Sequence, residues 1–579
     1  MTRVLAFSPY PNMAHMAYEL ALTSACQARG AEILHLLCDG IFSQCDVHWA
    51  SSTGTPRPFD LCQKCQARAA RLMQSSELPH EWLSKFVNAS DRQRALEWAH
   101  ALPLDQFMTA TFDGYPIAHW VVSSVATEFR RYPPDLSNSF VINVFRNYLH
   151  SGALASLALT HVLDEWRPDV LVVVNGRQSL TRVAVELARA RNLRFLTHDG
   201  PLRPWTRLVQ TNAHCNEIEP IKEYLDAWAQ IPLQKSELAA THAILTGRYY
   251  GWQPGIFSKP PVLGFRESAF GADMQQYDQV VGIFSSSTDE SAGSSEWLGA
   301  FTNQAEWIRA TCEIATQYPQ VLWILRVHPN SGIRTYLPSG YGDAEFFASL
   351  FVCLPPNMRM IPPDSESSTY ALMNLIDVGL VFHSTVGIEI AALGKPVLMV
   401  GRNYFVGMPH LQTLSHVTNY ADALAHLLQS APSREMRRYA YRYIYRFFMG
   451  MNFDFPAWVQ PILQQSAFTP PSLTKLLDPL FDPLCAFILR GEPIYTPPPV
   501  NLMRVTADEN VFFTELEALD EPYYDRVHAS RANLWYGSTS LSEHAKQYTR
   551  QMPTPLRAPL EWFGRTLHNS FKQILRPQG

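Results

Sequence analysis

Residues 376–404 have the sequence IDVGLVFHSTVGIEIAALGKPVLMVGRNY, in which apolar runs alternate with short polar and glycine-containing segments. The apolar run at 378–382 predicts a strand, and the polar pair Ser384 and Thr385 follows where that strand ends. A helix-forming run and a second apolar strand at 397–400 come next. A strand, loop, helix and strand in this order predict an open α/β sheet, which binds anionic ligands at the carboxyl ends of its strands. We therefore expect a nucleotide phosphate to bind beside Ser384 and Thr385.

Two earlier predicted strands also end in polar side chains. The apolar run at 279–284 continues into a hydroxyl-rich loop, and the run at 321–325 continues into Arg326 and His328. Alternation along this strand end places Arg326 and His328 on the same side of the sheet, where both can donate to one anion. The three strand ends together predict a donor pocket for a nucleotide. The candidate donor-binding residues are Ser286, Ser287, Arg326, His328, Ser384, Thr385, Gly387, Glu389 and Lys395.

Length and composition narrow the class of protein. With 579 residues the chain is too long for one hydrophobic core, and 47% hydrophobic with 17% charged residues is an ordinary globular composition. A net charge of −5 argues against a nucleic-acid partner, because no basic surplus is present to neutralise phosphates. No run of about eighteen apolar residues and no signal-peptide pattern is evident, so we expect a cytoplasmic protein, which could act at the inner face of the membrane.

The order of predicted elements indicates an α/β fold with two Rossmann-like domains that face a cleft. A strand, loop, helix and strand over residues 3–37 open the first domain, which we place at 1–270. The second, nucleotide-binding domain is placed at 271–431, and a helical, Pro-rich extension at 432–579. An amphipathic, mildly basic segment at 560–576 could rest on a membrane surface or a partner, but docking on its own domain is the default expectation.

Polar groups also mark the strand and helix ends of the first domain. His15 lies where the first loop meets the first helix, and it could act as a general base on a sugar hydroxyl or simply cap the helix. Asn175 and Arg177 follow the strongly apolar strand at 170–174, and they could bind the acceptor or form a turn.

Four cysteines predict a structural metal site in the first domain. Cys38, Cys45, Cys62 and Cys65 lie close in sequence and end in a C-x-x-C pair. Four soft ligands can close a tetrahedral zinc site, with an iron–sulfur cluster as the less favoured metal centre and His48 as a substitute ligand. Core cysteines that bind no metal are the alternative, because the first spacing is wider than in standard zinc fingers.

Several motifs resemble those of bacterial capsule and surface-polysaccharide biosynthesis proteins with the GT-B glycosyltransferase architecture. These are NGR at 175–177, FSSSTDE at 284–290, RVHPN at 326–330 and HSTVGIEIAALGKPV at 383–397. The last two also resemble the HP and Ser/Thr motifs with which bacterial sialyltransferases and capsule Kdo transferases hold a CMP-sugar. The resemblance covers about residues 165–405. It implies that His328, Ser384 and Thr385 contact the donor phosphate.

The resemblance implies transfer of a sugar from a CMP-, UDP- or GDP-activated donor to a surface polysaccharide or other glycan, free or lipid-linked. Glu389 would bind a donor hydroxyl and Lys395 a phosphate, although the turn at Lys395 could equally be structural. The acidic base of the sialyltransferase pattern is not identifiable here, so Asp113 and Asp199 are catalytic candidates beside His15. No paired-carboxylate metal motif is evident, which favours a metal-independent reaction.

Two further functions remain open from the sequence. A two-domain nucleotide-sugar epimerase also combines strand-end histidine and serine groups, and it needs no acceptor. A non-catalytic protein of polysaccharide assembly or export would bind glycan without converting it, in contact with the membrane periphery or an assembly complex.

Overall fold

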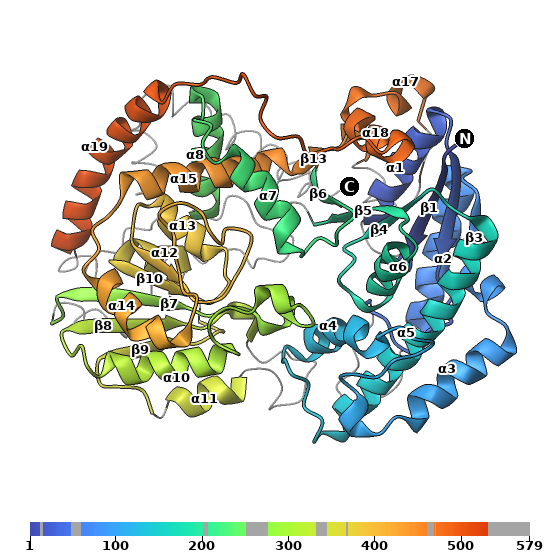
Figure 1. The fold of residues 1–579 in the computed structure, drawn as a ribbon, viewed down its shortest axis with the longest axis horizontal. Helices are drawn as coiled ribbons and strands as arrows, with labels where there is room; N and C mark the ends of the chain where they lie inside the picture. Colours follow the sequence, from blue (N-terminus) through green and yellow to red (C-terminus); the bar gives the residue numbers. More distant parts are fainter. Residues whose placement is uncertain are drawn as a thin grey trace, which may run out of the picture.

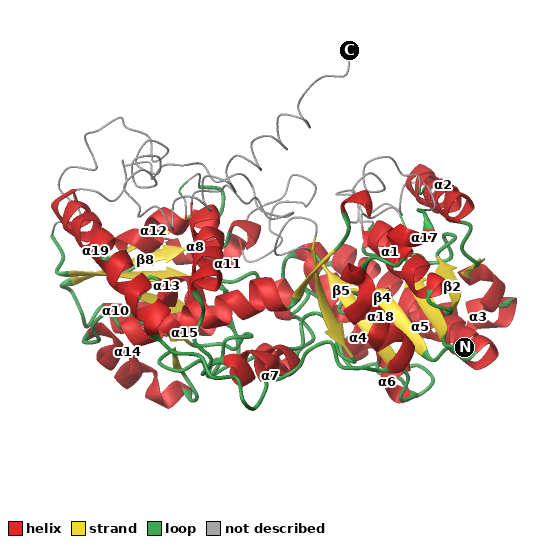
Figure 2. Ribbon diagram, turned by 90° about the horizontal axis from the view of Figure 1, so that it is seen from above, coloured by secondary structure: helices red, strands yellow, loops and turns green. Residues whose placement is uncertain are grey.

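The computed structural model describes residues 1–11, 15–47, 59–200, 206–249, 276–331, 344–351, 353–365, 367, 369–459, 468 and 471–530. Two α/β domains lie side by side (Figure 1), and helices cover both faces of each sheet (Figure 2). The predicted fold class, two Rossmann-like domains, is confirmed. The basic amphipathic segment at 560–576 and His48 lie outside the described residues.

The first sheet has seven strands. They are β1 (Arg3–Ser8), β2 (Glu32–Leu37), β3 (His80–Trp82), β4 (Val170–Val174), β5 (Arg194–Asp199), β6 (Thr206–Thr211) and β13 (Asn452–Asp454). Their order is β13-β6-β5-β4-β1-β2-β3. The five strands β5, β4, β1, β2 and β3 run parallel, and β1 lies at their centre. β6 and β13 form an antiparallel edge. The strand β13 comes from the segment that the sequence assigned to an irregular extension.

Alternation along β4 explains why helices cover both faces of this sheet. Leu171 and Val173 pack into one core with α4, α5 and α6, while Val170 and Val172 pack into another with α1. All four side chains are buried, as expected of a central parallel strand. The helices of this domain are α1 (His15–Ala28), α2 (Phe59–Ser76), α3 (Ala89–Ala101), α4 (Ile117–Phe129), α5 (Ser139–Trp166) and α6 (Ser179–Ala190).

The second sheet has six parallel strands in the order β12-β11-β10-β7-β8-β9. They are β7 (Gln279–Phe284), β8 (Val321–Arg326), β9 (Met358–Ile361), β10 (Val378–Val381), β11 (Val397–Met399) and β12 (Gln412–Thr413). Helices α10 (Gln304–Ala315), α11 (Ala344–Phe351), α12 (Thr369–Leu375), α13 (Val386–Ala392) and α14 (Tyr420–Leu428) connect or follow these strands. β7 lies between β8 and β10, so the three strands that carry the predicted donor residues are neighbours.

Helices that precede and follow the second sheet in sequence complete the second domain. Helices α7 (Ile218–Trp228) and α8 (Lys235–Tyr249) share a hydrophobic core with β7, α13 and α15 (Arg434–Tyr445). Helix α19 (Ala507–Ser530) joins them through a buried ion pair, in which Arg442 Nη2 lies 2.7 Å from Glu509 Oε2. The sequence had placed α7 and α8 in the first domain, because their packing partners lie far along the chain.

The C-terminal segment crosses from one domain to the other. Helices α17 (Leu473–Leu476) and α18 (Asp482–Arg490) pack on α1 of the first domain, and α19 packs on α8. Cys485 of α18 lies with its sulfur 3.6 Å from that of Cys26, and all nine cysteines are free thiols. None of the described helices combines the length and hydropathy needed to cross a bilayer.

Candidate functional site

The three strand ends of the second domain are tied together by hydrogen bonds. Phe284 at the end of β7 is in register with Arg326 of β8 and Val381 of β10. The Ser285 hydroxyl accepts from the backbone N–H of His328 at 2.7 Å, and the Ser286 hydroxyl accepts from the backbone N–H of His383 at 3.2 Å. The structure therefore brings the predicted donor loops into contact.

Two histidines in these loops, the buried His383 and the partly buried His328, are uncharged at neutral pH. Burial lowers the pKa of His328 to about 4; Asp289 opposes this shift, and Arg326 and Arg130 add to it. Burial also lowers the pKa of His383 to about 3, and its Nε2 lies 3.3 Å from the Ser291 hydroxyl. At neutral pH His328 can therefore offer a ligand a neutral N–H donor rather than a positive charge.

Arg326 holds a neighbouring loop and keeps its charge. Its Nη1 donates to the carbonyl of Pro362 at 2.6 Å, just after β9. Burial lowers the pKa of Arg326 to about 10, which leaves the guanidinium protonated at neutral pH. Because this charge acts on His328, the predicted pair lies close together, but one of the Arg326 donors is committed to the protein.

Ser384 and Thr385 lie half-buried at the start of α13. The Ser384 hydroxyl accepts from the backbone N–H of Val386 at 3.2 Å, and Thr385 is the residue that precedes the helix. A side chain at Gly387 would put its Cβ 2.9 Å from Val381, so the glycine lets α13 approach β10 closely. Gly387 thus serves packing, whereas Ser384 and Thr385 remain candidates for ligand contact.

Glu389 and Lys395 have partners within the protein instead of the predicted donor contacts. Glu389 is buried and pairs with Arg248 of α8, whose Nε lies 2.5 Å from the carboxylate. The buried Lys395 ammonium donates to three carbonyls, those of Met373, Asn374 and Ile376, at 2.7 to 2.9 Å. Since these carbonyls lie at the C-terminal end of α12, Lys395 caps that helix. These contacts favour the structural alternative for Lys395, and its phosphate contact stays a prediction.

A loop of the second domain contacts the first domain through Asp289, which the sequence did not single out. Asp289 lies in the short helix η3 (Thr288–Ser291), beside α4, and accepts from the Ser287 hydroxyl. Its carboxylate forms an ion pair with Arg130, and its backbone carbonyl accepts from Arg177 at 3.3 Å. The acidic residues that follow the serines in FSSSTDE were the available signal. Ser287 is therefore engaged within its own loop.

The predicted acceptor-side residues lie at the same boundary. Arg177 Nη1 donates to the hydroxyls of Ser123 at 2.5 Å and Thr127 at 3.2 Å, and the backbone N–H of Arg177 donates to Asn175. Asn175 in turn donates to Asp199 at 2.5 Å. Both predicted residues of the NGR motif therefore help to build the boundary between the domains.

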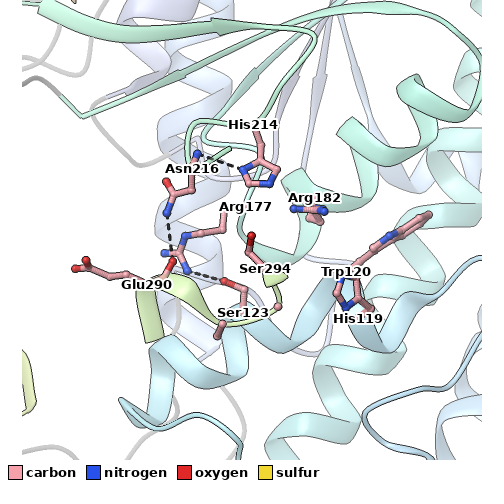
Figure 3. Close-up of a pocket in the computed structure, with 11 residues that line it drawn as sticks. His119, Trp120, Ser123, Arg177, Arg182, His214, Asn216, Glu290 and Ser294 are labelled. Atoms are coloured by element: carbon pink, nitrogen blue, oxygen red, sulfur yellow. Dashed lines mark hydrogen bonds between the residues drawn. The ribbon is translucent and has the colours of Figure 1, made fainter. Parts of the chain in front are cut away.

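A small recess opens between the domains beside these residues (Figure 3). It lies between α4, the first turns of α6, the segment after β6 and the loop after η3. Its lining is polar and includes two arginines and two histidines. The lining residues are His119, Trp120, Ser123, Arg177, Arg182, His214, Asn216, Glu290, Ala292, Gly293 and Ser294.

Glu290 is an ionisable residue at the boundary between the domains, and the sequence analysis did not identify it as a candidate base. Burial, and then Asp289, raise the pKa of its carboxyl to about 7, while Arg177 and Arg130 act in the opposite direction. The residue is still solvent-exposed. Its backbone carbonyl accepts from Asn216 of the first domain at 3.3 Å. An accessible carboxyl with a pKa near neutrality can take up a proton during a reaction.

The three predicted catalytic residues lie in different surroundings. His15 is buried, burial lowers its pKa to about 3, and its ring centre lies 6.4 Å from that of His198. Asp199 ends β5, and its carboxylate acts electrostatically on Tyr404 of the second domain, so it lies near the domain boundary. Asp113 instead forms an ion pair with Arg94 on the exposed side of α3, at 2.7 Å. The structure therefore does not bring Asp113 to the domain boundary.

The four predicted metal ligands line one pocket in the first domain. Cys38, Cys45, Cys62 and Cys65 surround it together with Pro9, Gly40, Val47 and Gln66. The backbone N–H of Gly40 donates to the Cys38 sulfur at 3.3 Å. In the described part of the chain, however, no three histidine, cysteine or acidic side chains are arranged as ligands of one ion. The spacing thus predicted proximity correctly, and metal binding stays a prediction.

The buried histidines predict that acid destabilises the fold. His15, His328 and His383 have folded pKa values of about 3 to 4, below the ordinary value of 6.5. As the pH falls below 6.5, the unfolded chain binds protons that the folded chain does not, so stability decreases until the folded pKa is reached. Each histidine contributes about 1.4 kcal/mol per pH unit in this window. Urea unfolding at pH 7, 6 and 5 should show a falling free energy; a constant value would contradict these pKa shifts.

The fold and the site define a class: a two-domain α/β protein in which polar strand ends meet at the domain boundary. No family model matches the sequence, and no curated protein matches it. Solved structures that match this chain include three enzymes. The spinosyn rhamnosyltransferase SpnG has 15% identity and a TM-score of 0.25, over 80% of this chain and 100% of that one.

The other two are an epimerase and a second sugar transferase. The UDP-GlcNAc 2-epimerase from Neisseria meningitidis has 13% identity and a TM-score of 0.27, over 77% of this chain and 97% of that one. The β-Kdo 2,4-transferase KpsC from Thermosulfurimonas dismutans has 14% identity and a TM-score of 0.29, over 48% of this chain and 79% of that one. At these identities and TM-scores the likeness assigns no function to this chain.

Proposed function

We propose that this protein transfers a sugar from a nucleotide-activated donor to a glycan or glycoconjugate acceptor at the domain boundary. The observation that supports this most is the joining of three strand ends, whose loops contain Arg326, His328, Ser384 and Thr385. Polar groups at the carboxyl edge of a parallel sheet form the usual site for a nucleotide in this class of fold. A CMP-, UDP- or GDP-sugar is the proposed donor, and a surface polysaccharide or lipid-linked glycan the proposed acceptor.

The donor side would act on the leaving group. Negative charge develops on the nucleotide phosphate as the bond to the sugar breaks, so fixed donors at that oxygen lower the barrier. The neutral His328 N–H, the charged Arg326 and the hydroxyls of Ser384 and Thr385 are the proposed donors. Because His328 is held by Ser285 through its backbone, its imidazole needs little reorganisation when the charge develops.

The acceptor hydroxyl must lose a proton as it attacks the sugar. Glu290 is the proposed proton acceptor, because it lies at the domain boundary and its pKa is raised to about 7. His15 is the second candidate, since its imidazole is neutral and its Nε2 has no hydrogen-bond partner in the described structure. With Glu290 as the base, activity should increase through pH 7 as the carboxyl deprotonates.

An assay with and without acceptor separates the three functions that the sequence left open. Purified protein is incubated with a nucleotide-sugar alone and then with a glycan acceptor, and the products are identified by mass spectrometry. We expect release of nucleotide and a lengthened glycan only when acceptor is present. A changed sugar still joined to its nucleotide, formed without acceptor, would indicate an epimerase instead. Binding of glycan without any product would indicate an assembly or export role.

The four-cysteine pocket is proposed to hold a structural zinc ion, with an iron–sulfur cluster as the less favoured alternative. Thiolates that surround one pocket can supply a complete tetrahedral set. Elemental analysis of protein purified without chelator should find about one zinc per chain, lowered by Cys62→Ser and unaffected by Cys353→Ser, which replaces an exposed cysteine. Protein free of zinc and iron would show that the pocket holds four reduced thiols.

A further inference from the structure

The recess between the domains contains a guanidinium whose terminal nitrogens have no hydrogen-bond partner among the described residues. Arg182 lies in the first turns of α6, and its Nε is 2.7 Å from the Glu186 carboxylate. Within the described structure, neither of its terminal nitrogens makes a hydrogen bond, although 16% of the side chain is exposed. Burial lowers the pKa of Arg182, as expected for a cation held away from bulk water. A largely buried guanidinium whose N–H donors make no hydrogen bond raises the free energy of the fold, unless an anion binds to it.

The charged groups of the recess are two guanidiniums and one carboxylate. Arg177 also lines it, and its Nε is buried without a hydrogen-bond partner in the described structure. Burial and then Arg182 lower the pKa of both His119 and His214, so these imidazoles are neutral at pH 7. Glu290 is the acidic residue of the lining, and in Figure 3 its carboxylate extends away from Arg182 and His214.

The acidic partner of Arg182 is shared, which leaves part of its charge available. Glu186 also pairs with Arg189, whose Nη1 lies 2.8 Å from the same carboxylate oxygen. Arg189 in addition pairs with Glu217 at 2.5 Å. Two guanidiniums thus share Glu186; Glu217 and Glu296 also act on Arg182, but in the described structure neither carboxylate pairs with its terminal nitrogens.

We propose that this recess binds an anionic group of the acceptor, a carboxylate or a phosphate, through the planar fork of Arg182. A guanidinium binds either oxyanion with two parallel N–H donors, and Asn216 and Ser294 lie beside it in the same lining. An acceptor held there by its charge lies at the same domain boundary as Glu290, the proposed proton acceptor. This inference rests on the proposed function for the identity of its ligand, and it makes the acceptor an acidic glycan or a phosphorylated one.

Anion binding can be measured without any glycosyl transfer. The full-length protein is titrated with inorganic phosphate and separately with glucuronate, at constant ionic strength, and the thermal unfolding midpoint is followed. We expect a saturable increase with one or both anions, and the stronger of the two identifies the oxyanion. Arg182→Gln should weaken the apparent affinity roughly tenfold or more, since a charge-assisted hydrogen bond is lost.

Arg189→Gln is the matched control, because Arg189 lies on the same helix and shares Glu186 but does not line the recess. It should leave anion binding unchanged. Equal loss in both variants, or no saturable effect on the wild type, would overturn the proposal. His328→Ala removes the proposed donor phosphate contact, so anion binding that survives it is not binding at the donor site. Arg182-dependent anion binding without any nucleotide binding would refute the proposed function and leave the recess assignment intact.

Discussion

His328→Ala is expected to lower the rate of glycosyl transfer by about 100- to 1000-fold, the usual effect of losing one fixed donor to a developing negative charge. The backbone N–H of His328 donates to the Ser285 hydroxyl, so alanine at position 328 retains that link between the loops after β7 and β8. The imidazole is neutral at pH 7, so its loss removes one N–H donor and leaves no unpaired charge behind. The measurement is the transfer rate at saturating donor, with circular dichroism to check the fold.

A surface histidine provides the control for this variant. His426 is exposed on α14, away from the three strand ends, and His426→Ala should keep the full rate. Normal transfer by a folded His328→Ala protein would exclude His328 from the donor site. Loss of the native circular dichroism spectrum would instead call for His328→Asn, whose amide keeps an N–H donor and should recover part of the rate.

Lys395→Met is expected to destabilise the second domain by about 3 kcal/mol or more. The ammonium donates to three carbonyls at the end of α12, and each carbonyl left buried without a donor costs about 1 to 3 kcal/mol. Methionine has a similar length, so little packing is lost and the polar contacts dominate the change. The free energy of unfolding, from urea titration followed by tryptophan fluorescence, measures the effect.

The same variant separates a structural lysine from one that binds phosphate. Lys475→Met on α17 replaces an exposed lysine and should change stability by less than about 0.5 kcal/mol. If Lys395 contacted a donor phosphate instead, Lys395→Met would keep its stability and lose nucleotide affinity. That result would reverse the role assigned here.

The fold followed from local sequence patterns because the central strands carry strong signals. The apolar runs at 170–174, 279–284, 321–325 and 378–382 lie at the strands β4, β7, β8 and β10. Their polar ends meet because parallel strands end at one edge of a sheet. Adjacency of the donor loops was therefore predictable from the order of strands and loops alone.

Partners that lie far apart in the sequence could not be predicted in the same way. β13 pairs with β6 across more than 240 residues, and its three residues carry no distinctive pattern. The capping role of Lys395 depends on where α12 ends, and the contact of Asp289 with Arg130 depends on how the domains meet. Spacing within a motif contains none of this information.

The four cysteines could be grouped from local sequence spacing, whereas the general base could not. Local spacing brought the four cysteines to one pocket, because they flank a single strand-to-helix connection. The choice of base required the environment of each acid: Asp113 pairs with Arg94 on the surface, whereas Glu290 lies at the domain boundary with a pKa near 7. Both are ordinary acidic residues in the sequence.

The central claim is that the joined ends of β7, β8 and β10 bind the nucleotide of a sugar donor. Thermal unfolding of the purified protein with CMP, UDP and GDP tests it most directly, because a ligand at 100 times its Kd stabilises by about 2.7 kcal/mol. We predict a shift with one of the three nucleotides that is lost in His328→Ala and kept in Arg182→Gln. The absence of a shift with every nucleotide, or a shift that His328→Ala leaves unchanged, would contradict the claim.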